Sequence, residues 1–294
     1  MPKEVEELIQ DYRDGKMTRR EFVQKAVLLM GGLAAATNLL DSMGIQRAYA
    51  AQPELVDSND PDLISGMVQF SGPASNLFGY QSRPKAAGSY AAVIVVHANR
   101  GLDDNIQNVA RRLAKEGYVG LALDYLSRQG GTAKALNPDG AIPNIRELVT
   151  SEVIKGDTGA TVTYLRGLKE VRGDRIGITG FCWGGGTAFQ AATLVRGFKA
   201  LVVFYGSTPN PPELLQQVEA VVLGHYGELD KRITEAAPAT AETMKKYGKS
   251  YEYKIYTGAP HGFAHDSGSR SYHPEAAKEA WGRTLEFFNK HLKT

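Results

Sequence analysis

One short stretch of the sequence has the residue types and the spacing of a nucleophile on a sharp turn. The apolar run Ile176–Phe181 leads into Cys182, and glycines stand two residues to either side of the cysteine, at positions 180 and 184. This is the pattern of a strand-to-helix turn that carries a nucleophile, with cysteine in the place of serine. Glycine at those two positions allows close approach of neighbouring backbone. The helix that follows would place its N-terminus at the sulfur, and the helix dipole favours the thiolate over the thiol.

Cys182 is the only cysteine in the 294 residues, so it has no intrachain disulfide partner. The alternative interpretation is a structural cysteine in a glycine-rich turn, because buried cysteines are common in proteins. A phosphate-binding loop fits less well, since the glycines follow neither the dinucleotide-binding spacing nor the P-loop spacing. The pattern therefore favours a nucleophile.

A cysteine nucleophile needs a base, and the base needs a group that orients it. The sequence supplies candidates in the order Cys182, Asp230, His261. Nucleophile, then acid, then histidine is the chain order of these groups in α/β-hydrolases. His261 would take the thiol proton on Nε2, while Asp230 would accept a hydrogen bond from Nδ1.

Alternatives stay open for both partners of the cysteine. Asp230 could serve only as the N-cap of a helix that begins at the next residue, and Glu228 is its nearest rival for the orienting role. His261 could be a turn histidine packed beside Phe263, and His265 lies only four residues further along.

Attack on a carbonyl group also requires donors for the oxygen that becomes negatively charged. One donor would be the backbone N–H of Trp183, the residue after the nucleophile. The second should come from the loop that follows the apolar run 91–96, and the backbone N–H of Asn99 is the candidate.

Strands that alternate with helices must position these residues. The loops at Ala98, Cys182, Asp230 and His261 each follow a run that reads as a buried strand. The alternation predicts an α/β fold, with a mostly parallel, doubly wound sheet flanked by helices. Ligands bind such sheets beyond the carboxyl ends of the strands. The predicted strands are 67–70, 77–81, 91–96, 118–123, 175–180, 200–205, 221–225 and 251–256. One predicted helix is capped by Asp104 and ends at Gly117, and three longer ones cover 145–168, 231–247 and 274–292.

Composition limits the classes of function. With 43% hydrophobic and 22% charged residues, the chain suits one large α/β domain, which we place at residues 51–294. A formal net charge of +2 and the lack of a basic cluster predict no nucleic-acid partner. No apolar run is long enough for a stable membrane span. The histidine and cysteine spacing predicts no metal site, and we expect no cofactor.

The first 50 residues differ from the rest. Thr18–Lys25 matches a twin-arginine export signal, the moderately apolar stretch Ala26–Leu40 follows, and Ala48–Ala50 offers a cleavage site. This order predicts a leader, with export to the periplasm by the twin-arginine route. In the alternative, residues 1–50 are an N-terminal helical extension of a cytoplasmic protein, because residues 4–13 have the spacing of an amphipathic helix.

The motifs together resemble those of the dienelactone hydrolase family, α/β-hydrolases similar to carboxymethylenebutenolidase. The residues that carry the resemblance are Gly180–Gly185, Gly227–Asp230, Pro260–Phe263 and the His97–Gly101 loop, and it covers roughly residues 60–292. The resemblance implies a catalytic triad of Cys182, Asp230 and His261 that opens lactones or cleaves activated esters through a thioester acyl-enzyme.

Two positions depart from the family pattern. Family members usually carry Glu between the His and Asn of the loop, where this chain has Ala98; that Glu is thought to contact the resting thiol and to help switch it on. Dienelactone hydrolase itself has Arg where this chain has His265, and histidine cannot form the forked pair with a carboxylate that arginine forms.

Three residues are candidates for binding substrate. Arg146 lies near a second carboxylate-binding Arg of the family, although it could equally be a solvated helix charge. His265 takes the place of the first such Arg, and Tyr125 follows the predicted strand 118–123.

We therefore expect a hydrolase that acts on a small-molecule lactone or activated ester, as a monomer or a homodimer. One alternative is a general carboxylesterase or thioesterase on the same triad. The other is a catalytically weakened binding protein, for which Ala98 is the main argument.

Overall fold

The computed structural model describes residues 3–13, 16, 22, 25–26, 29, 55–137, 142–264 and 269–294. The arginine pair at 19–20 and the small residues at 48–50 lie outside the described residues, as does His265. The chain divides into two compact units, Met1–Gln52 and Pro53–Thr294.

Helix α1 (Lys3–Arg13) belongs to the first unit. Its buried side chains Val5, Leu8 and Ile9 stand at the spacing of one helix face. No helix in the described part of the chain is both long and apolar enough to cross a membrane.

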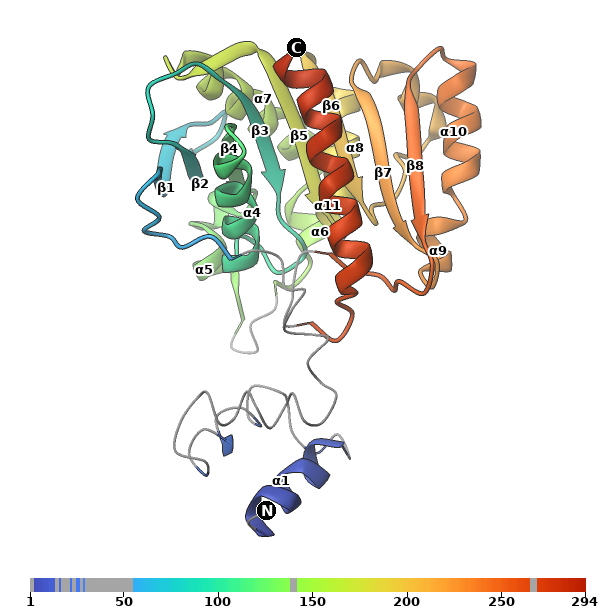
Figure 1. Ribbon diagram of the computed structural model, residues 1–294. Coiled ribbons are helices and arrows are strands. Elements are labelled where there is room, and N and C mark those ends of the chain that lie inside the picture. The colour runs from blue at the N-terminus through green and yellow to red at the C-terminus, as the bar shows by residue number, and fades with distance from the viewer. Residues whose placement is uncertain are drawn as a thin grey trace. The chain divides into compact units, whose positions relative to one another are not determined.

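The second unit is built on a sheet of eight strands in the order β1-β2-β4-β3-β5-β6-β7-β8 (Figure 1). The β1–β2 and β2–β4 pairs are antiparallel, and all the other neighbouring strands run parallel. The mostly parallel sheet is therefore confirmed. Its strands are β1 (Leu63–Ser71), β2 (Asn76–Pro84), β3 (Tyr90–Val96), β4 (Val119–Asp124), β5 (Val171–Phe181), β6 (Phe198–Phe204), β7 (Val221–Gly227) and β8 (Tyr251–Tyr256).

Helices cover both faces of the sheet. Successive side chains of a strand point to opposite faces, and in β3 residues 91, 93 and 95 share one core with α4 and α11, while 92, 94 and 96 share the other with α7 and α8. Burial on both faces explains the continuous apolar run of this strand. The helices are α4 (Asp104–Lys115), α5 (Thr132–Ala135), α6 (Ile145–Leu148), α7 (Ser151–Gly167), α8 (Trp183–Leu194), α9 (Lys231–Thr234), α10 (Ala237–Lys246) and α11 (Pro274–Phe288), with 3₁₀ turns η2 (Ser127–Gln129) and η3 (Pro212–Gln217) and a π turn η4 (Asn289–Lys293).

Three helix predictions need correction. The N-cap of α4 is Asp103 and not Asp104, because the Asp103 carboxylate accepts from the Ile106 N–H at 3.0 Å. The predicted helix 145–168 is interrupted, because Thr150 has extended backbone and caps the N-terminus of α7. The predicted helix 231–247 is also interrupted, and α10 restarts with a proline in its first turn, where the missing N–H costs nothing.

The beginning of the second unit is fixed to α4. The Val56 N–H donates to Asn108 Oδ1 at 3.0 Å, and the Val56 carbonyl accepts from Arg111 Nε at 2.8 Å. Arg111 also donates to the Tyr80 hydroxyl at 3.0 Å and is itself buried. Buried hydrogen bonds to a charged group hold a segment more firmly than exposed ion pairs do.

His225 in β7 is fully buried and carries no charge at neutral pH. The Thr284 hydroxyl donates to the Ala280 carbonyl, so it accepts from His225 Nε2–H at 3.0 Å, and the Tyr256 hydroxyl donates to Nδ1 at 2.9 Å. Burial lowers the pKa of His225 to about 3, from an ordinary value of 6.5.

This shift predicts a loss of stability in mild acid. Above pH 6.5, His225 is neutral in both the folded and the unfolded chain. Below pH 6.5, His225 of the unfolded chain binds a proton that the folded chain excludes. The free energy of unfolding therefore falls by roughly 2 kcal/mol between pH 7 and pH 5 through this group. We expect His225→Gln to be less stable at pH 7 but to have a shallower pH dependence, measured by denaturant unfolding at several pH values. An unchanged slope would contradict the assignment.

Candidate active site

The turn between β5 and α8 places Cys182 in strained backbone. Cys182 has φ 58° and ψ −122°, a left-handed conformation that L-residues other than glycine rarely adopt. Such strain costs on the order of 1–3 kcal/mol and persists only where surrounding structure enforces it. Here the Cys182 N–H donates to the Phe204 carbonyl at 3.0 Å, which fixes the turn to the end of β6.

The two flanking glycines are required by packing. A Cβ atom on Gly180 would lie 2.1 Å from the Gly184 carbonyl oxygen, and a Cβ atom on Gly184 would lie 2.2 Å from the His97 carbonyl oxygen. A side chain at position 180 would therefore push α8 away from the end of β5, and one at position 184 would push α8 away from the end of β3. The pattern identified in the sequence thus brings the N-terminus of α8 against the loop that carries Ala98 and Asn99.

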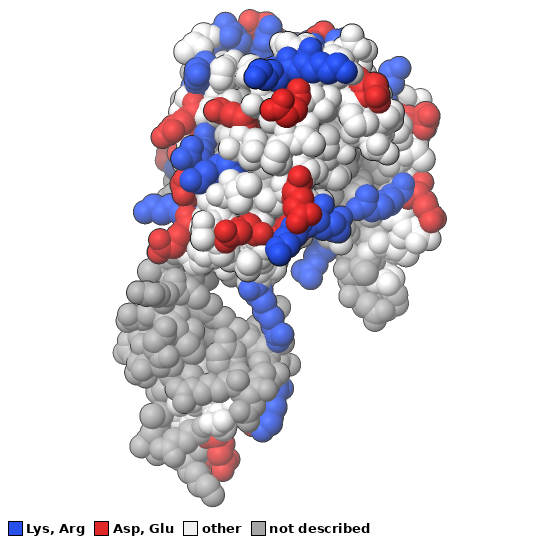
Figure 2. Space-filling view, turned by 90° about the vertical axis from the view of Figure 1, so that its right-hand side faces the viewer, with Lys and Arg blue, Asp and Glu red and all other residues white. Residues whose placement is uncertain are grey.

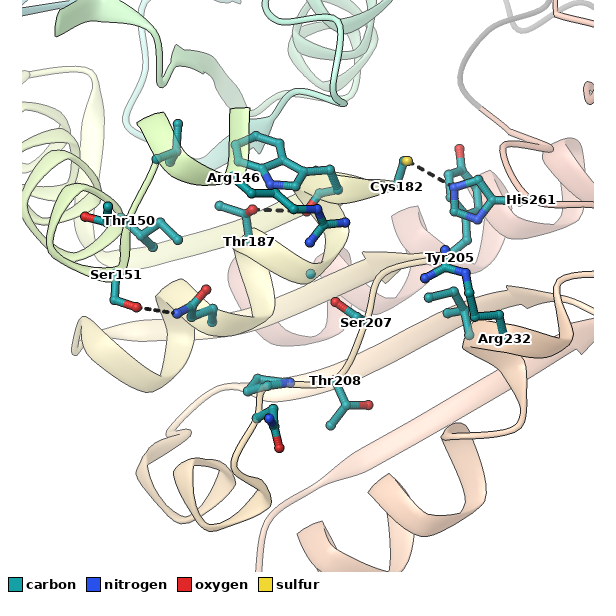
Figure 3. Close-up of a pocket in the computed structure, with 18 of the residues that line it drawn as sticks. Arg146, Thr150, Ser151, Cys182, Thr187, Tyr205, Ser207, Thr208, Arg232 and His261 are labelled. Atoms are coloured by element: carbon teal, nitrogen blue, oxygen red, sulfur yellow. Dashed lines mark hydrogen bonds between the residues drawn. The ribbon is translucent and has the colours of Figure 1, made fainter. Parts of the chain in front are cut away.

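Cys182, His261 and Asp230 meet although they lie far apart in the chain. His261 Nε2 lies 3.0 Å from Cys182 Sγ (Figure 3). His261 Nδ1 is hydrogen-bonded to Asp230 Oδ2. Asp230 occupies the N-cap position of α9 but its side chain makes no capping bond, so the carboxylate is directed to the histidine. The rival Glu228 is exposed and accepts from the Gly258 N–H at 2.8 Å instead.

Electrostatics favour a charged pair at this contact. The hydrogen bond with Cys182, together with Asp230, raises the pKa of His261 to about 9 against the opposing effect of burial. Burial by itself would raise the pKa of the Cys182 thiol. The hydrogen bond and charge of His261, the Trp183 N–H and the charge of Arg146 outweigh it, and the pKa lies below its ordinary value. Both shifts favour a thiolate beside an imidazolium at this contact.

The two predicted oxyanion donors lie in different surroundings, one at the Cys182 sulfur and the other in an exposed loop. The Trp183 N–H at the start of α8 is directed at the Cys182 sulfur, where it lowers the pKa of the thiol. Asn99 is exposed in the loop after β3, next to the buried Ala98. The role of Asn99 as the second donor stays a prediction.

A cavity of about 510 Å³ opens beside Cys182 and His261. Its other walls come from α6, the start of α7, α8, the loop after β6, and α9 (Figure 3). Arg146 lines this cavity from α6, as its suggested role in substrate binding requires. The interruption between α6 and α7 also brings Thr150 to the wall.

Tyr125 does not line the cavity, which is a correction to its suggested role. The side chain is fully buried, its hydroxyl is hydrogen-bonded to Thr158 at 2.6 Å, and its ring meets that of Trp183 edge-on at 6.2 Å. Tyr125 thus supports Trp183 from behind. The sequence around a tyrosine at the end of a strand does not indicate whether its side chain lines the cavity or is buried behind Trp183.

Two residues that the sequence motifs do not identify also line the cavity. Tyr205 follows β6 with φ 39°, and its ring meets the His261 ring edge-on, 5.1 Å between centroids. Arg232 reaches the cavity from α9, two residues after Asp230. The only available signal was their position, each just beyond the carboxyl end of a buried strand.

His97 lies beneath the site in neutral form. It is fully buried, and burial lowers its pKa. Nδ1–H donates to the Ala98 carbonyl at 2.7 Å, Nε2 accepts from the Tyr125 N–H at 3.2 Å, and the ring stacks on Trp183. These contacts hold the loop after β3 against the start of α8.

The described part of the chain contains no cluster of three or more His, Cys, Asp or Glu side chains that could hold a metal ion. On the face that Figure 2 shows, basic and acidic side chains are interspersed.

Comparison with known proteins identifies relatives over most of the second unit. The model of the dienelactone hydrolase family matches residues 77–292. A Methylorubrum extorquens protein named "Putative carboxymethylenebutenolidase" is 29% identical over 273 residues, which cover 88% of this chain and 94% of that protein. A Bradyrhizobium protein named "Probable 2-oxo-3-(5-oxofuran-2-ylidene)propanoate lactonase" is 36% identical over 235 residues, which cover 76% and 94%.

Solved structures of the same family resemble the second unit. The crystal structure of a "Putative Dienelactone Hydrolase" from Klebsiella pneumoniae has a TM-score of 0.68 and 28% sequence identity, and the match covers 78% of this chain and 99% of that one. The α/β-hydrolase fold predicted from the motifs is thereby confirmed, and so is the class of enzyme. With its sheet, its turn at Cys182 and its relatives in accord, this hydrolase belongs to the dienelactone hydrolase family.

Proposed function

We propose that the protein hydrolyses lactones or activated carboxylic esters through a triad of Cys182, His261 and Asp230. One observation carries the proposal: Cys182 Sγ is 3.0 Å from His261 Nε2 while Asp230 is hydrogen-bonded to Nδ1. A nucleophile in reach of a base, with the base oriented by a third group, is the arrangement that acyl transfer requires.

Acylation begins from the charged pair. The Cys182 thiolate attacks the carbonyl carbon, and the C–S bond forms as the carbonyl electrons move to oxygen. The Trp183 N–H, with the Asn99 N–H as second donor, stabilises this oxyanion. The C–O bond to the alcohol then breaks, His261 gives its Nε2 proton to the departing alkoxide, and a thioester remains on Cys182.

Deacylation restores the pair. His261, now neutral, takes a proton from water as the water oxygen attacks the thioester carbonyl. The C–S bond breaks, the acid leaves, and thiolate and imidazolium are regenerated. When the substrate is a lactone, the alcohol stays attached to the acyl group and the product is a hydroxy acid. Asp230 accepts from Nδ1–H throughout and stabilises each imidazolium.

A catalytically weakened binding protein is the weaker candidate. It was suggested by Ala98, but the thiol and the carboxylate are each within hydrogen-bonding reach of the imidazole without any group from that position. A general carboxylesterase or thioesterase would use the same triad, and only a comparison of substrates separates it from a lactonase.

Substitution of the nucleophile tests the proposal. We expect Cys182→Ala to lower turnover of p-nitrophenyl acetate by at least about a thousandfold, because no thioester can form, while the thermal unfolding transition is retained. Cys182→Ser should retain little activity, since a hydroxyl ionises far less readily than a thiol. Turnover by the alanine variant at the rate of the unsubstituted enzyme would assign the chemistry to another residue.

The charged pair also predicts how Cys182 reacts when free. Since its pKa is lowered and that of His261 is raised to about 9, iodoacetamide should alkylate Cys182 readily at pH 6, where an ordinary thiol reacts slowly. As Cys182 is the only cysteine, the labelled fraction measured by mass spectrometry reports on this thiol alone.

The same assay tests position 98. In Ala98→Glu a carboxylate beside the sulfur would disfavour the thiolate, so labelling should shift toward higher pH. Protein unfolded in guanidinium chloride supplies the ordinary titration for comparison. If the two folded forms share one profile, and it matches the unfolded control, position 98 does not tune the nucleophile and the resting pair is wrong.

A further inference from the structure

We propose that the cavity wall away from Cys182 recognises the hydroxyl groups of a polyhydroxylated ester, such as an acylated sugar. This proposal rests on the proposed function, because it assumes that the ester carbonyl lies at Cys182. We call this wall the polar lobe, and define it by Ser151, Gln190, Ser207, Thr208 and Asn210.

The polar lobe is separate from the reacting groups. In Figure 3, Cys182 and His261 lie together on one side of the cavity, Ser151 lies on the opposite side, and Thr208 lies below. A cavity of about 510 Å³ is within the range that holds ligands of drug size. It therefore has room for a second group beyond a reacting acetyl group or small lactone ring.

The lobe has unusually many polar side chains for a ligand cavity. Most such cavities are lined mainly by apolar and aromatic groups, with a few polar groups that fix orientation. Here hydroxyl and amide side chains come from three separate elements: the start of α7, the second half of α8, and the loop after β6. The apolar residues Val149, Ile154 and Pro209 line the same cavity, so these polar groups act beside apolar contacts.

Several of these groups have hydrogen-bonding capacity to spare. Gln190 Nε2 donates to Ser151 Oγ at 2.8 Å, which leaves the Ser151 O–H and the Gln190 carbonyl for a ligand. The hydroxyls of Thr208 and Thr240 are paired at 2.6 Å, and Thr240 donates to the Ala236 carbonyl, so Thr208 keeps its acceptor sites.

Two groups of the loop after β6 are entirely available. Among the described residues, neither the Ser207 hydroxyl nor the Asn210 amide makes a side-chain hydrogen bond. Ser207 lies close to the start of α8, because a Cβ atom on Gly186 would be 2.6 Å from its Oγ. Its hydroxyl therefore lies beside the first turn of α8, the helix that follows the nucleophile.

Desolvation makes such a wall selective. An apolar group that displaces water here leaves donors and acceptors without partners, whereas a hydroxylated group replaces the lost hydrogen bonds. A site that hydrogen-bonds a substrate hydroxyl discriminates strongly against the analogue that lacks it. With several such groups in the lobe, we expect the hydroxylated member of a matched pair of esters to be favoured at least tenfold in kcat/KM.

The test compares two acetates that differ in the ring hydroxyls. Methyl 6-O-acetyl-glucopyranoside and cyclohexylmethyl acetate each join a primary acetate to a six-membered ring, and acid release from both is followed with a pH indicator. A tenfold or greater preference for the sugar ester supports the proposal. Equal rates, or a preference for the cyclohexyl ester, overturn it.

Variants locate the preference. Ser207→Ala and Gln190→Leu should each reduce the ratio of the two kcat/KM values about three- to tenfold. Thr243→Val, on α10 and away from the cavity, removes a comparable hydroxyl and should leave the ratio unchanged. A preference that survives both lobe substitutions would place recognition elsewhere and overturn the proposal.

A binding measurement separates this proposal from the proposed chemistry. In Cys182→Ala no acyl transfer occurs, so the sugar ester should raise the Tm in a concentration-dependent way and the cyclohexyl ester should not. If p-nitrophenyl acetate is not hydrolysed by the unsubstituted enzyme, the triad proposal fails, and this difference in Tm still decides whether the lobe binds hydroxylated ligands. No difference in Tm overturns the lobe proposal even where Cys182-dependent turnover is intact.

Discussion

The site depends on a close approach of backbone to backbone at the start of α8. Gly180 and Gly184 leave no room for a Cβ atom, and Gly206 lies equally close to Gly185. This packing holds the helix N-terminus between the ends of β3 and β6, and Cys182 takes a left-handed conformation as a result. The strained turn is the physical reason that a half-buried thiol stands at the carboxyl edge of the sheet, at the positive end of a helix.

A second layer of contacts fixes the direction of the groups around the thiol. Asp230 holds His261 from one side and the ring of Tyr205 meets it edge-on, while buried, neutral His97 supports Trp183 from below. The residues that make these contacts lie far apart in the sequence. The parallel sheet brings them together, because its strands end at the same edge. The mutual pKa shifts of Cys182 and His261 follow from that placement, since each group stabilises the charged form of the other.

The fold and the residues that meet at the site could be predicted from the sequence. Cys182, Asp230 and His261 each follow a run that reads as a buried strand, and parallel strands end at the same edge, so their convergence could be predicted from chain order. The break between α6 and α7 could not, because Thr150 lies within an apolar periodicity that continues across it. Tyr125 and Tyr205 show the same limit: both follow buried strands, yet one is buried behind Trp183 and the other lines the cavity.

We propose that the acyl group of the substrate is transferred to Cys182 as a thioester, and trapping this intermediate tests the proposal most directly. The enzyme would be mixed with a slowly deacylating activated ester, quenched in acid within milliseconds to seconds, and digested for mass spectrometry. The account predicts a mass increase equal to one acyl group on the peptide that contains Cys182, released by hydroxylamine as a thioester is. Turnover of the same ester with the acyl group on another residue, or with no acylated peptide before and during the steady state, would contradict it.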